Sequence, residues 1–360
     1  MAAEPVDLPV TDASTIAVGE VLDLLDGRFR NFATGLYRQR YALWLGSGIS
    51  RDRVPGLPEL VLRVVEHLRA KADFDNEGCP FAKAFHASLH LASLSALERP
   101  GIDLAVPVQS WTIAEVVSTR LTAAYSALFN IQVDGEAADY LLWNALDVVG
   151  VYASDDLEPD CEHLCIALLV LDSSIQSMVS ANWDGLIESA VCELAGPAAD
   201  HALGVCVLAR DLQDEQGRAT LYKIHGCAVL AKQDEADYRS LLIGRVRQIA
   251  GWPAGLSSDA AKARLIDLAR TKRTFMVGLS AQDSNIQFIF GQDADNVVWS
   301  WPCDPPSHVF AEQSIGDSQR LLLQLAYGDA YDDHRDEIEA AALLQAFAKP
   351  VLVALVLGDC

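Results

Sequence analysis

Apolar residues in the first part of the chain follow two different patterns. Residues 12–40 place Ile16, Val18, Val21 and several leucines on one stripe at helical spacing. Residues 41–45 (YALWL) are apolar throughout and end at a Gly-Ser-Gly turn, as is typical of a strand buried on both faces of a parallel sheet. We therefore predict helix over 12–40 and a buried strand over 41–45.

The strand pattern returns in the second half of the chain. Further strands are predicted at 175–180, 204–209, 221–224, 274–278, 296–299 and 308–311, and the helices between them include 186–194, 256–270 and 317–327. Strands that alternate with helices are typical of a parallel sheet with helices on both faces. We therefore predict an α/β fold with a doubly wound parallel sheet.

The stretch between these two parts has no convincing strand. Helical patterns resume after Pro58 and continue through 81–171, so we predict an α/β domain made of 1–65 and 172–360, with a helical insertion over 66–171. Residues 332–357 are also predicted to be helical. We expect this C-terminal helix either to pack on the α/β domain or to continue into another module.

The chain is strongly acidic, which bears on its partners. Among its 360 residues, 50 are Asp or Glu and 27 are Lys or Arg, so the formal net charge is −23. A surface of that sign repels a phosphate backbone. Direct binding of DNA or RNA by this chain is therefore disfavoured.

Cysteine usage and the chain ends indicate a cellular compartment. The eight cysteines include no C-x-x-C pair, and several lie in apolar runs, which is typical of reduced thiols. The first residues lack the basic and apolar regions of a signal peptide, and the apolar run 351–357 is too short to span a bilayer. We expect a soluble cytoplasmic protein without a membrane segment.

Four polar segments follow predicted strands, where a doubly wound sheet binds its ligands. They are Gly46-Ser47-Gly48-Ile49-Ser50, Ala181-Asn182-Trp183-Asp184, Lys223-Ile224-His225-Gly226, and Val277-Gly278-Leu279-Ser280 with Asp283. Each also has a structural interpretation, as a tight turn, a helix cap or a histidine that only packs. Their common position at strand ends favours one shared ligand site.

The first of these segments suits a phosphate. Its glycines let the backbone approach a pyrophosphate, and its amides and the hydroxyls of Ser47 and Ser50 can donate hydrogen bonds to it. The usual dinucleotide fingerprint has a third glycine where Arg51 stands. Taken alone, this segment is therefore as typical of a plain strand and turn as of a phosphate-binding loop.

Taken in order, five motifs resemble those of the sirtuin family: GSGIS, Gly56-Leu57-Pro58, NWD, KIHG and GLS, over about 40–65 and 175–315. The resemblance implies a Rossmann-like sheet that binds NAD. It implies that His225 is the catalytic histidine, that Asn182 and Asp184 lie near the nicotinamide and its ribose, and that Gly278 and Ser280 lie on the adenosine side. We expect the cofactor to be bound by Gly46, Ser47, Gly48, Ser50, Gly278, Ser280 and Asp283.

The chain departs from sirtuin deacylases in two places. It lacks the two C-x-x-C pairs of their zinc module, and Glu59-Leu60-Val61 stands where they carry Asp-Phe-Arg. Cys161, His163 and Cys165 form a C-x-H-x-C, but residues two apart on a helix point in different directions and cannot converge on one ion. We therefore expect no metal. The chain resembles the zinc-free sirtuin-like proteins of bacterial antiphage defence, which hydrolyse NAD to nicotinamide and ADP-ribose.

Other functions stay open alongside NAD hydrolysis. A protein deacylase would use the same histidine, a sensor of NAD or ADP-ribose would tolerate its loss, and a structural subunit would show no turnover. An enzyme that destroys NAD must stay nearly silent in a healthy cell, so we expect control by homo-oligomerisation or by a partner protein. The resemblance points to a HerA-type translocase ATPase or an Argonaute-like protein as that partner.

Overall fold

The computed structural model describes residues 12–214, 218–252, 259–292 and 298–358. In these residues one parallel sheet has the strand order β3-β4-β2-β1-β5-β6-β7. The strands are β1 (Tyr41–Leu45), β2 (Ser177–Ser180), β3 (Leu203–Cys206), β4 (Ala219–Lys223), β5 (Arg273–Val277), β6 (His308–Ala311) and β7 (Leu343–Leu344). From β1 the chain builds one half of the sheet and then returns with β5 to the other side of β1. The doubly wound, Rossmann-like α/β fold is confirmed.

Both faces of the sheet are covered, which explains the unbroken apolar run of β1. Successive side chains of a strand point to opposite faces. Tyr41, Leu43 and Leu45 pack in one hydrophobic core, whereas Ala42 and Trp44 pack in a second core on the other face.

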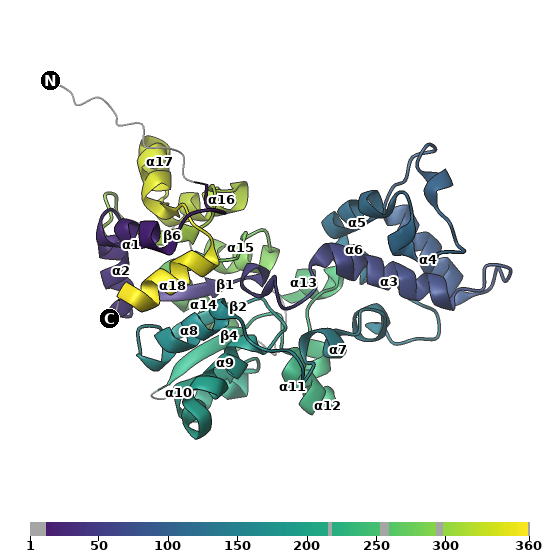
Figure 1. Ribbon diagram of the computed structural model, residues 1–360, viewed down its shortest axis with the longest axis horizontal. Helices are drawn as coiled ribbons and strands as arrows, with labels where there is room; N and C mark the ends of the chain where they lie inside the picture. Colours follow the sequence, from purple (N-terminus) through teal and green to yellow (C-terminus); the bar gives the residue numbers. More distant parts are fainter. Residues whose placement is uncertain (1–11, 215–217, 253–258, 293–297, 359–360) are drawn as a thin grey trace.

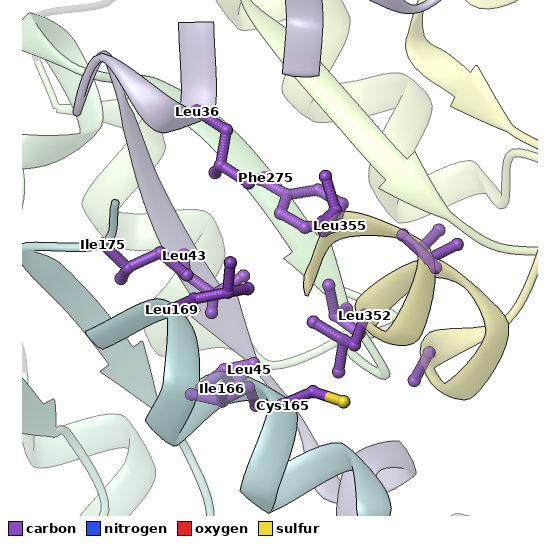
Figure 2. Packing of buried hydrophobic residues seen from close by; sticks show 14 of the residues in the cluster. Leu36, Leu43, Leu45, Cys165, Ile166, Leu169, Ile175, Phe275, Leu352 and Leu355 are labelled. Atoms are coloured by element: carbon purple, nitrogen blue, oxygen red, sulfur yellow. The ribbon is translucent and has the colours of Figure 1, made fainter. Parts of the chain in front are cut away.

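One face carries the N-terminal helices and the C-terminal helix. Its helices are α1 (Val18–Asp26), α2 (Arg30–Tyr37), α8 (Cys161–Leu171), α9 (Leu186–Ala195), α10 (Ala199–Ala202) and α18 (Ala348–Gly358). Helix α18 packs against both α1 and α8 (Figure 1). Figure 2 shows Leu352 and Leu355 of α18 in the same core as Leu169 of α8 and Phe275 of β5. The C-terminal helix therefore packs on the α/β domain.

The opposite face is covered by helices from the second half of the chain. They are α14 (Asp259–Thr271), α15 (Ser284–Gly291), α16 (Asp317–Tyr327) and α17 (Asp329–Ala342), and α13 (Val246–Gly251) contacts α15.

A third group of helices has its own hydrophobic core and forms a separate lobe beside the sheet (Figure 1). It contains α3 (Leu57–Lys71), α4 (Pro80–Leu91), α5 (Ala114–Ala123), α6 (Tyr125–Leu128), α7 (Val148–Tyr152), α11 (Ala228–Gln233), α12 (Glu235–Tyr238) and a π-helical turn at Leu141–Ala145. We call this group the helical lobe. The core of this lobe includes Ala228 and Ala231, which follow β4. In contrast, α8 falls within the range 66–171 but packs with the sheet.

Three sequence-based element assignments need correction. Residues 12–40 form two helices that are separated at Gly27, where the backbone leaves helical geometry. The helix predicted over 332–357 is divided by β7, because Leu343 and Leu344 pair with β6 at the edge of the sheet. Val298 and Trp299 lie outside any strand. The rest of that predicted strand, 296–297, lies outside the described residues, as do the first residues of the helix predicted over 256–270. In the described residues, no helix is long and apolar enough to cross a membrane.

Candidate functional site

The glycines after β1 and β5 allow two loops to touch at the centre of the sheet. The amide of Gly46 donates to Val277 O at 3.2 Å, and the amide of Gly48 donates to Gly278 O at 3.1 Å. A Cβ at Gly48 would lie 2.6 Å from Gly278 Cα, and Gly278 itself has φ +62°. Strands β1 and β5 are also where the direction of winding reverses, the position at which such sheets bind ligands. The contact between the two loops is therefore sufficient to explain these glycines.

A cavity of about 590 Å³ lies between the carboxyl ends of the strands and the helical lobe. The sheet contributes residues that follow β1, β2 and β4, namely Ser47, Arg51, Ala181, Asn182, Trp183, Asp184 and His225. The other wall consists of the segment from Val54 to Pro58 with Leu60, Tyr125, Phe129, Tyr152 and Ile243. The three predicted catalytic residues thus line one cavity, whose apolar wall comes largely from the helical lobe.

Asn182 is buried, and its amide has a fixed orientation. Its Nδ2 group donates to Gly46 O at 3.1 Å and lies 3.4 Å from Ser50 Oγ. These two contacts use both hydrogens of the amide. Within the described residues, Oδ1 is left as the acceptor that Asn182 offers to the cavity.

Asp184 both accepts a hydrogen bond from the start of a helix and lines the cavity. Its Oδ1 accepts the amide of Leu186 at 3.2 Å, at the start of α9. The carboxylate also lines the cavity beside Tyr152, and burial together with this negative charge raises the pKa of Tyr152. The Tyr152 hydroxyl therefore stays protonated and can donate a hydrogen bond.

His225 is held by a carboxylate that follows β5. Its Nε2 lies 3.1 Å from Oδ2 of Asp283 and 3.4 Å from Nδ2 of Asn285. The main-chain carbonyl of His225 accepts the indole N–H of Trp183 at 3.0 Å. Burial raises the pKa of Asp283, but the hydrogen bond from His225 and the amides of Asn285 and Ile286 lower it more, so its pKa lies below the usual value. Asp283 therefore holds His225 as an ionised carboxylate.

The predicted cofactor residues occupy different positions around this site. Ser47 lines the cavity, whereas Ser50 is fully buried behind it and contacts Asn182. Asp283 caps α15 and holds His225, and Ser280 is exposed outside the cavity wall. The structure therefore brings Ser50 to Asn182 and Asp283 to His225, and leaves Ser280 apart from these predicted catalytic residues.

Several site residues had no functional signature in the sequence. Tyr125, Phe129 and Tyr152 come from helical segments whose apolar periodicity indicates only packing. Arg51 stands where the dinucleotide fingerprint has glycine, and here its cationic side chain lines the cavity next to Ser47. The only candidate functional pattern in the sequence that includes His163 is the C-x-H-x-C. Within the described residues, no group of three or more His, Cys, Asp or Glu is placed to hold a metal ion.

Residues 176–297 match the family model of a SIR2-like domain. The match supports a sirtuin-like family. It spans β2 to α15 and includes Asn182, Asp184, His225 and Asp283, so it indicates an NAD-related function for the cavity. No curated protein matches the chain.

Proposed function

We propose that this protein is an NAD glycohydrolase, which cleaves the nicotinamide–ribose bond of NAD and releases nicotinamide and ADP-ribose. The observation that carries the proposal is the His225–Asp283 pair, whose histidine lines the same cavity as Asn182 and Asp184 within the region that matches a SIR2-like domain. Depletion of NAD in antiphage defence is the biological role that the sequence resemblance favours.

The cavity fits such a substrate in size and in chemistry. Ligand cavities commonly have volumes of about 300–1,000 Å³ and mostly apolar walls with a few polar groups. Arg51 and Ser47 supply a cation and a hydroxyl suited to the pyrophosphate. Asn182 and Asp184 supply acceptors suited to ribose hydroxyls, and the aromatic side chains of the helical lobe exclude water from the bond that breaks.

Each polar side chain has a separate role in the proposed reaction. When the bond between the nicotinamide nitrogen and ribose C1′ breaks, the nitrogen keeps the electron pair and positive charge develops at C1′. The Asp184 carboxylate stabilises that charge from the cavity wall. A water oxygen then bonds to C1′, while Asn182 Oδ1 orients the water or a ribose hydroxyl.

His225 is the base in this scheme. Because Nε2–H donates to Asp283, the neutral imidazole keeps Nδ1 unprotonated and able to accept the proton released by water. The carboxylate of Asp283 then stabilises the imidazolium that forms. No other proton acceptor is required for this step.

The test is to incubate the purified chain with NAD and to quantify nicotinamide and ADP-ribose by chromatography. His225→Ala and Asn182→Ala should each lower nicotinamide release at least about 100-fold while the variants stay folded by circular dichroism. His201→Ala, at an exposed histidine of α10, is the matched control and should keep wild-type activity.

Three outcomes would refute the proposed activity or the roles given to these residues. Wild-type turnover by the His225 or Asn182 variant would remove these residues from the mechanism. Release of a deacylated acyl-lysine peptide together with consumption of NAD would indicate a deacylase. Tight NAD binding without turnover would indicate a sensor.

A further inference from the structure

His163 is a second buried histidine, behind the cavity wall. It lies on α8, outside the matched SIR2-like region, and has no exposed surface. Its Nε2 lies 3.1 Å from Ser50 Oγ, and its Nδ1 accepts the main-chain N–H of Asp160 at 3.0 Å. Through Ser50 it is therefore connected to Asn182.

The start of α8 determines which nitrogen of His163 carries the proton. Asp160 is the N-cap of the helix, and His163 occupies the position three residues on, where a capping box usually has Glu or Gln. Because Nδ1 accepts a main-chain N–H, the neutral imidazole must carry its hydrogen on Nε2 and donate it to Ser50. Burial lowers the pKa of His163, against the opposing charges of Asp184 and Asp160, so the neutral form is favoured.

The Ser50 hydroxyl connects His163 to Asn182 by hydrogen bonds. Its hydroxyl oxygen has two acceptor positions, one for His163 Nε2–H and one for Asn182 Nδ2. The second hydrogen of that amide goes to Gly46 O. A flipped Asn182 would place its carbonyl oxygen against Gly46 O, while the Ser50 hydroxyl could still donate to that oxygen, so Gly46 O selects the orientation and Ser50 fixes the position of the amide. The arrangement therefore specifies one orientation of the amide.

We propose that His163 is a positioning residue, which acts through Ser50 to hold Asn182 with Oδ1 toward the substrate. The inference rests on the proposed function, because it concerns the same reaction. His163 does not line the cavity, and its hydrogen-bond link to a cavity residue runs through Ser50 to Asn182.

The decisive comparison is between His163→Gln and His163→Leu. The Gln side chain can accept the N–H of Asp160 through Oε1 and donate to Ser50 through Nε2, whereas Leu can do neither. His163→Leu should lower kcat about 10- to 100-fold with KM close to that of the wild type. His163→Gln should recover most of that loss. Equal kcat values in the two variants would overturn the inference.

A second variant covers the case in which His163→Leu fails to fold. Ser50→Ala leaves His163 in place but removes the oxygen that connects it to Asn182. It should lower kcat to a similar extent, and adding His163→Gln should then cause no further loss. A wild-type kcat in Ser50→Ala would show that Ser50 does not connect His163 to Asn182.

A readout that does not depend on turnover separates this inference from the proposed function. In NMR spectra, the side-chain amide hydrogens of Asn182 should exchange slowly with water in the wild type and in His163→Gln. They should exchange faster in Ser50→Ala and in His163→Leu. Unchanged exchange in both of these variants would overturn the inference, whereas absence of nicotinamide release by the wild type would overturn only the proposed function.

Discussion

Asp283 has two tasks at the scale of a single residue. One carboxylate oxygen accepts the amide of Asn285 at 2.7 Å to cap α15, and the other lies 3.1 Å from His225. The cap alone would explain an aspartate at this position, since Asp is a common N-cap. The contact with the histidine makes the same carboxylate part of the candidate active site.

Asp283→Asn should separate these two tasks. Asn is also a good N-cap, so α15 should form, but a neutral amide cannot stabilise the imidazolium as a carboxylate does. We expect kcat for NAD cleavage to fall about 100-fold or more while the far-ultraviolet circular dichroism stays unchanged. Wild-type kcat in this variant would show that Asp283 is only a cap.

The same residue should produce a pH dependence of stability. A carboxyl whose pKa is lower in the folded chain stabilises the fold at pH values above its unfolded pKa and loses that effect as the pH falls through its folded pKa. The pKa of Asp283 lies below the usual 3.8. The difference in unfolding free energy between the wild type and Asp283→Asn should therefore shrink as the pH falls below 3.8. Urea denaturation across this range measures it, and a constant difference down to about pH 2 would contradict it.

At the scale of elements, the contact between the β1 and β5 loops depends on glycine. In Gly48→Ala the new Cβ would meet main-chain atoms of Gly278, which cannot move without shifting the loop. We expect a loss of about 1–3 kcal/mol in unfolding free energy and lower NAD cleavage, because Ser47 and Ser50 would move with the loop.

Gly19→Ala is the matched control for this prediction. Nothing lies within 4 Å of a Cβ at Gly19, which is in α1. Alanine should stabilise this helix by about 0.5–1 kcal/mol and leave activity unchanged. If Gly48→Ala had the same effect on unfolding free energy and activity as Gly19→Ala, the contact between the β1 and β5 loops would not require glycine at position 48.

Helix α18 stabilises the sheet through a few buried side chains. Leu352 and Leu355 have no exposed surface, whereas Leu357 is 52% exposed. Leu352→Ala should lower the unfolding free energy by about 2–5 kcal/mol, and Leu357→Ala should change it by less than about 0.5 kcal/mol. Chemical denaturation measures both, and equal effects would show that α18 does not pack as described.

At the scale of the whole molecule, the helical lobe supplies one wall of the cavity and so offers a route to control. A shift of Tyr125 or Tyr152 relative to the strand ends would open or close the cavity to water. We propose that self-association or a partner protein sets this position. The partners that the resemblance favours are a HerA-type translocase ATPase and an Argonaute-like protein.

Light scattering with parallel NADase assays tests this control. Nicotinamide release per chain should rise with protein concentration as oligomers form, or on addition of the partner. A fully active monomer that gains nothing under either condition would refute the control, while the catalytic assignment would stand. Because the net charge of −23 disfavours nucleic acid as a direct ligand, addition of DNA alone should have no effect.

The sequence by itself determined strands β1 to β6 and the polar segments that follow β1, β2, β4 and β5. An unbroken apolar run such as 41–45 has few alternatives to a strand covered on both faces, and its glycine turn marks the end. The order of the turns after β1, β2, β4 and β5 therefore predicted that Ser47, Asn182, Asp184 and His225 would approach one another. The reversal of winding at β1 is given only by the strand order of the folded sheet.

Only the tertiary structure decided what completes the site. His163 reaches Ser50 across 113 positions, and Asp283 reaches His225 across more than 50, because α8 and α15 pack beside strands that are distant in sequence. Local pattern specifies which face of a helix is apolar, but not which strand end lies against its first turn. The same limit hid β7, whose two leucines become a strand only because β6 offers unpaired main-chain groups at the edge of the sheet.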